Sequence, residues 1–276
     1  MTSEGTMLPA ALKAVGLSSS SYYYKPKENR KPRALDMELV DAITSVRQGR
    51  AEVYGYRKIT RALKAKEMIF NGKKVLRHLR ALGLTQPRKV KGAGWTRLDM
   101  VKPENPNTYW EADFTYVWTG EGNAYLCAVI DAWDRDITGD MLSDRCRAIE
   151  ASEALEKAVM SRFGGKVPQD HQLTLRVGRG SQFRAHRFRE TARLLNVKLE
   201  YAGIKCPEDK PYIEAFFSSY KTEEIYRKEY RSYWEAKVSW EDYRKWYRNN
   251  RLHQGIDYMS PVQYAQRAQK SILLVA

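Results

Sequence analysis

The chain has 276 residues, a formal net charge of +15 and 43% apolar residues, enough for one sizeable core with smaller modules attached. No run of about 18 apolar residues is present, and the start MTSEGTMLPAALKAVGL lacks the basic-then-apolar order of a signal peptide, so we expect a soluble intracellular protein. Three widely spaced cysteines, Cys127, Cys146 and Cys206, argue against a disulfide framework and a zinc finger.

Positive charge is concentrated in the first hundred residues. These hold 21 Lys and Arg against 8 Asp and Glu, whereas the rest of the chain holds 27 against 25. A concentrated positive field is typical of proteins that bind a polyphosphate such as DNA. A solvated basic surface would give the same count, so charge by itself leaves both interpretations open.

Residues 1–34 predict a short helical segment and a basic linker. Leu8, Leu12 and Val15 form one apolar stripe, and the serine run that follows could cap a second helical turn. The stretch KPKENRKPR at 25–33 has the charge and the prolines of a linker.

Residues 35–86 predict three short helices, because apolar residues recur there at spacings of three and four. Asn71 and Gly72 offer a turn and a cap before the third helix. Two short helices joined by a turn, the second with a basic face, are what a DNA-reading helix-turn-helix requires, although any small helical bundle shares this apolar pattern. His78 is expected at the surface. The residues expected to contact DNA are Lys73, Lys74, Arg77 and Arg80.

Beyond a linker at 87–106, the pattern predicts a mixed α/β domain. Strands are expected at 108–117, 123–132 and 135–141, and Trp110, Ala112, Phe114 and Tyr116 should share the core face of the first. Helices at 148–163, 185–195 and 209–227 then alternate with strands at 173–177 and 197–201. Four aromatic residues at helical spacing are interpreted as core rather than as a base-stacking platform: Trp240, Tyr243, Trp246 and Tyr247.

Five segments, taken in order, resemble landmarks of the DDE transposases of bacterial insertion sequences. They are ADFTY, VIDAWDRDITG, VGRGSQF, PEDKPYIEAFFSSYKTEEIY and WYRNNRLHQGIDYMSPVQY. The resemblance implies a ribonuclease-H-like (integrase) catalytic core at 107–235, after the helix-turn-helix region and before a helical tail at 236–276. It also implies the second-frame product of a two-frame transposase, acting in the bacterial cytoplasm at the nucleoid. The implied partners are the terminal inverted repeats and target DNA, further copies of the chain and an upstream-frame protein, without a membrane.

The same resemblance implies that Asp113 and Glu214 are catalytic ligands of Mg²⁺, for which Mn²⁺ can substitute. The family's second aspartate stands 35 residues before the glutamate, and this position is Gly178 here. Two-metal phosphoryl transfer needs carboxylates to hold both ions, and glycine supplies none. We therefore predict impaired strand cleavage and transfer with retained DNA binding. Asp131, Asp134, Asp136 and Asp170 are the acids weighed as substitutes; the last three are interpreted as surface acids.

Several other positions carry two interpretations. Lys221 and Arg179 are expected to contact DNA, although Lys221 could be a solvated lysine. Arg251 and His253 could reach a phosphate or hold the C-terminal tail against the core. Two alternatives to a transposase stay open: a catalytically inactive DNA-binding protein on the same fold, and a ribonuclease-H-type nuclease without transposition.

Overall fold

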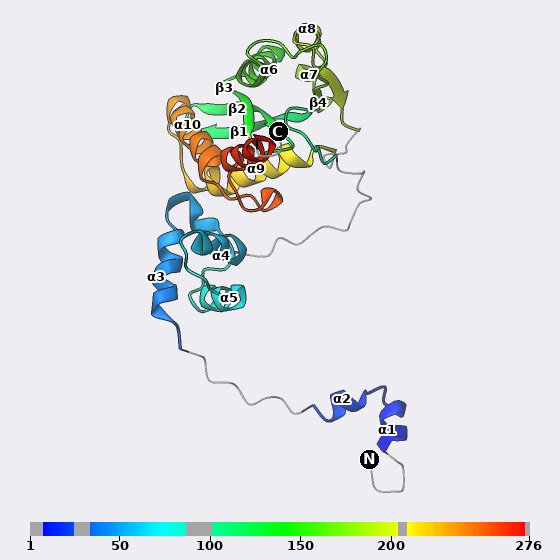
Figure 1. Ribbon diagram of the computed structural model, residues 1–276, viewed down its shortest axis with the longest axis vertical. Coiled ribbons are helices and arrows are strands. Elements are labelled where there is room, and N and C mark those ends of the chain that lie inside the picture. The colour runs from blue at the N-terminus through cyan, green and yellow to red at the C-terminus, as the bar shows by residue number, and fades with distance from the viewer. Residues whose placement is uncertain (1–7, 25–33, 87–100, 204–208, 274–276) are drawn as a thin grey trace. The chain divides into compact units, whose positions relative to one another are not determined.

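The computed structural model describes residues 8–24, 34–86, 101–203 and 209–273 (Figure 1). The linker predicted at 25–33, most of the linker predicted at 87–106, and Cys206 lie outside the described residues. The chain divides into two compact units, Met1–Val40 and Asp41–Ala276. In the first unit, α1 (Leu8–Ala14) is followed by the short α2 (Ser19–Tyr22), which Ser18 caps by accepting a hydrogen bond from the backbone N–H of Ser21 at 3.1 Å.

The predicted helical region contains α3 (Met37–Val46), the 3-10 turn η1 (Gly49–Val53), α4 (Tyr56–Ala65) and α5 (Gly72–Ala81). The side chain of Asn71 caps α5 by accepting a 2.8 Å hydrogen bond from the backbone N–H of Lys73. Helices α4 and α5 pack together through their buried Ile59, Leu63, Val75 and Leu79. The expectation of a surface histidine at position 78 is wrong.

His78 is fully buried on the inner face of α5, where its Nδ1 lies 2.8 Å from the carbonyl oxygen of Lys74. The ring therefore satisfies one polar atom within its own helix while the rest of it packs in the core.

A five-stranded mixed sheet forms the centre of the remaining chain, as predicted. Its strands are β1 (Tyr109–Thr119), β2 (Gly122–Asp131), β3 (Ile137–Ser143), β4 (Thr174–Val177) and β5 (Lys198–Tyr201), in the order β3-β2-β1-β4-β5. The first three strands pair antiparallel, and β4 and β5 join the other edge of β1 in parallel. β1 therefore lies at the centre of the sheet, flanked by an antiparallel and a parallel neighbour.

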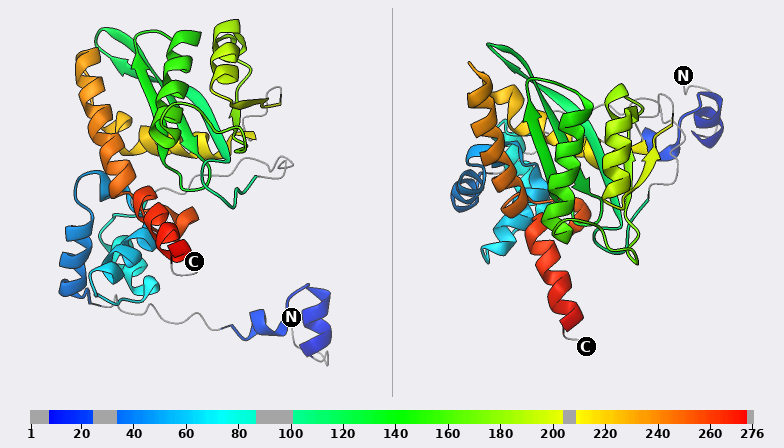
Figure 2. Two further views of the ribbon diagram at one scale, coloured as in Figure 1. Left: turned by 45° about the horizontal axis from the view of Figure 1, so that its top comes forward. Right: turned by 90° about the horizontal axis from the view of Figure 1, so that it is seen from above.

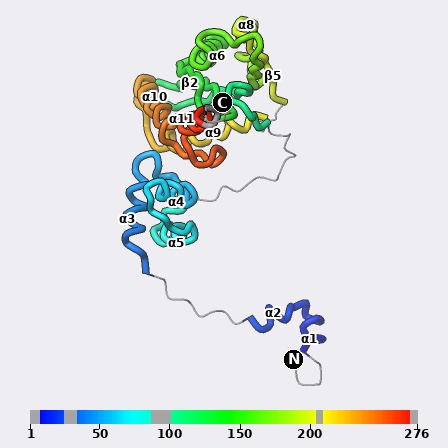
Figure 3. The backbone as a smooth tube through the Cα atoms, in the orientation of Figure 1, coloured from blue at the N-terminus to red at the C-terminus, as the bar shows by residue number. Residues whose placement is uncertain are grey.

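Helices cover both faces of this sheet (Figures 1 and 2). One face packs against α6 (Ala148–Phe163), α7 (Ser181–Arg184) and α8 (His186–Leu194), and the other against α9 (Pro211–Glu223) and α10 (Tyr233–Asn249). The helix predicted at 209–227 ends earlier, at Glu223, and a 3-10 turn η3 (Ile225–Arg227) follows it. After the 3-10 turn η4 (Gln254–Ile256), α11 (Pro261–Leu273) packs against α10 (Figure 3).

The aromatic residues of α10 lie in the core, as interpreted from their spacing. Trp240, Tyr243 and Tyr247 are buried against Phe216 and Tyr220 of α9, and Trp246 is partly buried beside them.

The core face predicted for the first strand is correct only for its first half. Trp110 and Ala112 are buried among the residues of α6, whereas Tyr116 is 51% exposed. β4 pairs with Tyr109–Ala112, so the second half of β1 extends beyond its parallel neighbour. Sequence alternation indicates which residues share a face, but it does not reveal how far the covering layer reaches.

Gly139 in β3 allows the close packing of the sheet against α6. A Cβ added at this position would lie 2.2 Å from the carbonyl oxygen of Ala154 and 2.5 Å from the backbone nitrogen of Ala158. These distances leave no room for any side chain, which explains the glycine in the VIDAWDRDITG segment.

Candidate active site

The sheet brings Asp113 and Gly178 together. Parallel pairing matches Ala112 of β1 with Val177, the last residue of β4, and Asp113 and Gly178 are the residues that follow these two along the chain. A Cβ added to Gly178 would lie 3.8 Å from Oδ1 of Asp113. The backbone of Gly178 lies outside the left-handed region, so its conformation does not require glycine. An aspartate would therefore be compatible with the backbone at this position.

Glu111 fixes the start of α9 against β1. Its Oε2 accepts hydrogen bonds from the backbone N–H groups of Tyr212 at 2.8 Å and Ile213 at 2.9 Å, in the first turn of the helix. These N–H groups have no partner within the helix, and the positive end of the helix dipole favours a carboxylate there. Burial raises the pKa of Glu111 to about 7, against the opposing effect of the two hydrogen bonds. In the sequence, Glu111 is marked only as an acid two residues before Asp113 on the same face of the strand, and nothing nearby indicates its contact with α9.

Lys210, which precedes α9, completes this cluster. Its Nζ lies 2.5 Å from Oδ2 of Asp113, and a Cβ at Gly178 would lie 3.2 Å from the same Nζ. The Lys210 side chain is 7% exposed and that of Asp113 30%. Glu214 stands one turn further along and is half-buried, and its backbone N–H donates to the carbonyl oxygen of Lys210 at 3.2 Å. Lys210 lies in the segment PEDKPY, whose sequence gives no sign of this contact.

As they stand, these residues do not fit the pair of divalent cations that the resemblance implies. Within the described ranges, no three His, Cys, Asp or Glu side chains are grouped so that they could hold one metal ion. Magnesium prefers an octahedral shell of oxygen atoms. Asp113 instead faces an ammonium group on one side and a glycine on the other. The metal-binding roles of Asp113 and Glu214 stay predictions.

The neighbouring acids have structural partners. Asp131 is fully buried and accepts hydrogen bonds from the backbone N–H groups of Trp133 and Asn107. The interpretation of Asp134 and Asp136 as surface acids is wrong, because they are 1% and 4% exposed and both accept hydrogen bonds from Arg162.

Burial, with a contribution from Asp131, raises the pKa of Asp134 to about 7. Arg162 comes from α6, 26 residues after Asp136, so local sequence gave no sign of this pairing. Asp170 is exposed, as interpreted.

The six residues expected to contact DNA are distributed over the helical region and the core. Lys73 and Arg80 are exposed on α5, whereas Lys74 and Arg77 are half-buried. Arg179 is exposed, donates from Nε to the carbonyl oxygen of Ala202 at 2.8 Å, and lines a cavity of about 410 Å³ with Arg184, Arg189 and Tyr201. Lys221 is half-buried on α9, and its Nζ lies 4.8 Å from the ring centre of Tyr116.

For Arg251 the structure decides between the two interpretations. Its guanidinium donates to both carboxylate oxygens of Glu223 at 2.7 and 2.8 Å, and to Ser219 at 2.8 Å. The Arg251 side chain is 9% exposed, and His253 lies against it with Nδ1 at 3.1 Å from Nη1. Burial, followed by the charge of Arg251, lowers the pKa of His253 well below its usual value. These two residues therefore hold the C-terminal tail against α9.

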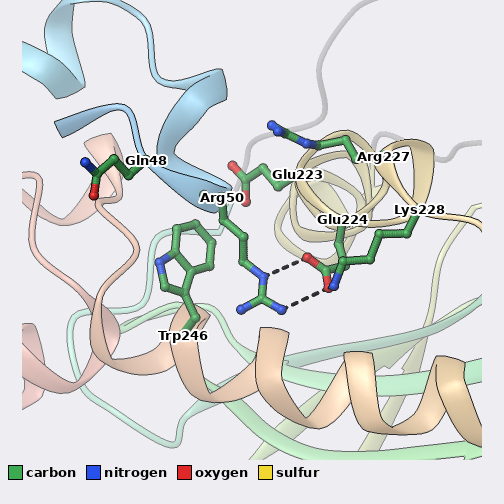
Figure 4. A pocket seen from close by; sticks show the side chains of 8 residues that line it. Gln48, Arg50, Glu223, Glu224, Arg227, Lys228 and Trp246 are labelled. Atoms are coloured by element: carbon green, nitrogen blue, oxygen red, sulfur yellow. Dashed lines mark hydrogen bonds and ion pairs between the residues drawn. The ribbon is translucent and has the colours of Figure 1, made fainter. Parts of the chain in front are cut away.

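An ionic contact between Arg50 and Glu224 joins the helical region to the core (Figure 4). Arg50 of η1 donates from Nε and Nη2 to the Glu224 carboxylate at 2.7 and 2.9 Å, on one side of a cavity of about 530 Å³. Glu224 is 1% exposed and also accepts hydrogen bonds from Lys228 and Ser239. Arg50 and Glu224 are 174 positions apart in the chain, so local sequence gives no sign of this pair.

No helix in the part of the chain that the structure describes has both the length and the apolar character needed to span a bilayer. Residues 103–205 match the integrase core domain family, residues 214–268 match a second integrase core domain family, and residues 34–92 match the HTH-like domain family. The third match covers the region predicted to hold the helix-turn-helix.

The chain is similar over most of its length to curated transposases. It is 28% identical over 250 residues to the transposase for insertion sequence element IS904 of Lactococcus lactis, covering 86% of this chain and 96% of the relative. It is 28% identical over 270 residues to the putative transposase for IS986/IS6110 of Mycobacterium tuberculosis, covering 91% and 97%. For transposase InsF for insertion sequence IS3A of Escherichia coli, the identity is 29% over 236 residues, with coverage of 78% and 77%.

Among solved structures, a chain of the simian T-cell lymphotropic virus intasome in complex with PP2A regulatory subunit B56 gamma has a similar fold. Its TM-score is 0.51 at 14% sequence identity, covering 74% of this chain and 69% of that chain. The mixed α/β core, the helix-turn-helix-like region that precedes it and the matches along both support an insertion-sequence transposase with an integrase core domain.

Proposed function

We propose that this transposase binds the end DNA of its insertion sequence and that its own strand cleavage and transfer are strongly impaired. The observation that carries the proposal is the pair Asp113, in the middle of β1, and Gly178, directly after the end of β4. The family resemblance assigns a second carboxylate to this position beside Asp113. A Cβ there would need only a small shift of the Lys210 ammonium group, 3.2 Å away, but glycine supplies no ligand. The proposal is supported by similarity to transposases along most of the chain.

DNA binding is proposed to depend on α5. Asn71 fixes the start of this helix, and Lys73 and Arg80 are exposed along it. A helix presented in this way can enter the major groove, and lysine and arginine side chains there contact phosphates and base edges. The excess of positive charge in the first hundred residues strengthens the attraction to DNA.

Fluorescence anisotropy with a labelled duplex that carries one terminal inverted repeat of the encoding element tests this binding. The double variant Lys73→Glu/Arg80→Glu should bind at least about tenfold more weakly than the unmodified chain. Lys166→Glu/Lys270→Glu makes the same change of charge at two other exposed positions and serves as the control. Equal losses in both double variants would show that total charge, rather than α5, determines binding.

Loss of cleavage is proposed from the chemistry of position 178. Enzymes of this class hold two divalent cations between carboxylates, and mutation of a ligand removes a large part of the rate enhancement. The bound complexes should therefore show no Mg²⁺- or Mn²⁺-dependent cleavage at the repeat end. Cleavage by the unmodified chain at the rate of the Gly178→Asp variant would be inconsistent with this proposal if both rates are measurable.

Self-association and an upstream-frame partner are further parts of the proposed function. Light scattering of the DNA-bound chain should give a mass of more than one copy, and co-expression with the upstream reading frame should allow co-purification. A complex with one copy of the chain would contradict self-association. An upstream product that never co-purifies would contradict the upstream-frame partner.

A further inference from the structure

Lys210 occupies a place at Asp113 that a metal ion would need. Its Nζ lies 2.5 Å from Oδ2 of Asp113. A magnesium ion would lie about 2.1 Å from a carboxylate oxygen. The ammonium group is therefore within about half an ångström of the radius at which this oxygen would bind the ion. An ammonium group and a metal ion cannot share that place.

The Lys210 side chain is held in place by the residues around it and is not free to move at the surface. The side chain is 7% exposed, and a lysine buried to this extent needs a charged or hydrogen-bonding partner. Its backbone lies at the N-terminal end of α9, which the buried Glu111 holds against the strand that carries Asp113. Glu111 and Asp113 of β1 thus hold the start of α9 and the Lys210 ammonium group against the same strand.

The lysine also faces position 178. A Cβ there would lie 3.2 Å from Nζ, which is closer than its 3.8 Å distance from Asp113 Oδ1. An aspartate introduced at position 178 would therefore place its carboxylate next to an existing positive charge. Opposite charges at this separation pair directly, and a buried pair is screened little by salt.

We propose that Lys210 acts as an internal cation that neutralises Asp113 and excludes a divalent metal ion from this site beside the end of β4. This inference rests on the proposed function and extends it: the chain differs from a metal-binding site at two positions, and restoring the carboxylate at position 178 is not sufficient to restore metal binding. The site binds a divalent cation when position 178 is acidic and position 210 is uncharged.

Isothermal titration with MnCl₂ on the full chain tests this proposal without relying on activity. Four proteins are compared: the unmodified chain, Gly178→Asp, Gly178→Asp/Lys210→Met and Gly178→Asp/Lys210→Arg. Methionine is close to lysine in length and has no charge, whereas arginine keeps the charge. Thermal unfolding of each protein confirms that the variants are folded before titration.

The Met double variant should bind Mn²⁺ at least about tenfold more tightly than Gly178→Asp, a difference of about 1.4 kcal/mol. The Arg double variant should bind no better than Gly178→Asp. Adding Asp113→Asn to the Met double variant should abolish the gain, which locates the ion at this site.

Equal affinity of Gly178→Asp and its Met double variant would overturn the role of Lys210, whether both bind or neither does. Such a result would leave the proposal for Gly178 intact, because that proposal is decided by cleavage with the unmodified chain. Conversely, cleavage by the unmodified chain would refute the proposed function whatever the titrations show.

Discussion

Substitution of Glu111 by alanine tests whether this carboxylate holds α9 on the sheet. The change removes the acceptor for two buried N–H groups, at Tyr212 and Ile213. Leaving a buried donor without a partner costs about 1–3 kcal/mol. Relief from burying the carboxylate offsets part of the loss, so we expect Glu111→Ala to reduce the free energy of unfolding by about 2–4 kcal/mol. Glu111→Gln keeps a carbonyl oxygen for both donors and should cost less than about 1 kcal/mol.

Urea unfolding followed by circular dichroism measures both costs. Hydrogen exchange adds a local measurement, since the amides at the start of α9 should exchange at least about tenfold faster in Glu111→Ala than in the unmodified chain. A cost below about 0.5 kcal/mol for alanine, or equal costs for alanine and glutamine, would refute the assigned role of Glu111.

Three further substitutions test other contacts. Arg50→Ala should destabilise the chain by about 2–3 kcal/mol in urea unfolding. The loss is smaller than for a fully buried pair because Lys228 and Ser239 still contact Glu224. The control Arg193→Ala removes an exposed ion pair and should cost under about 1 kcal/mol, and equal costs for the two variants would contradict the account. Gly139→Ala should cost at least about 3 kcal/mol because its Cβ would meet the α6 backbone. Gly55→Ala is the control: no atom lies within 4 Å of its Cβ, and replacing this N-cap glycine of α4 should cost under about 1 kcal/mol. Similar melting temperatures of the two variants would count against this packing. Burial lowers the pKa of Lys58 from 10.5 to about 7. Between pH 7 and pH 10.5 the folded chain therefore binds fewer protons than the unfolded chain, and its stability relative to Lys58→Met should rise from pH 7 to pH 9.5. A difference in urea midpoints between the two proteins that does not change with pH would disprove this expectation.

Much of the fold could be predicted because its signals are local. Stripes at spacings of three and four indicated α4 and α5, and a nearly continuous apolar run indicated β2 as an interior strand of a covered sheet. Asn71 as a cap and the helix ending at Phe163 followed from short-range chemistry in the same way. The register of the sheet could not be predicted from local sequence, because it depends on pairing between residues far apart in the chain.

The candidate site was predictable only in part for the same reason. The spacing learned from the family indicated Gly178, and the pairing of β1 with β4 then placed it beside Asp113. Lys210 pairs with a residue 97 positions away, and Glu111 with amides 101 and 102 positions away, so neither contact had a local signal. Asp134 and Asp136 were misinterpreted as surface acids because their partner Arg162 lies on another element.

Cleavage by the unmodified chain tests the central claim most directly. The chain is bound to an end-labelled duplex that carries the terminal inverted repeat, Mn²⁺ is added, and the products are separated on a denaturing gel. The account predicts a stable complex in which the labelled strand stays intact. Cleavage at the repeat end that disappears in Asp113→Asn would show a working catalytic site despite Gly178 and Lys210, and would contradict the account.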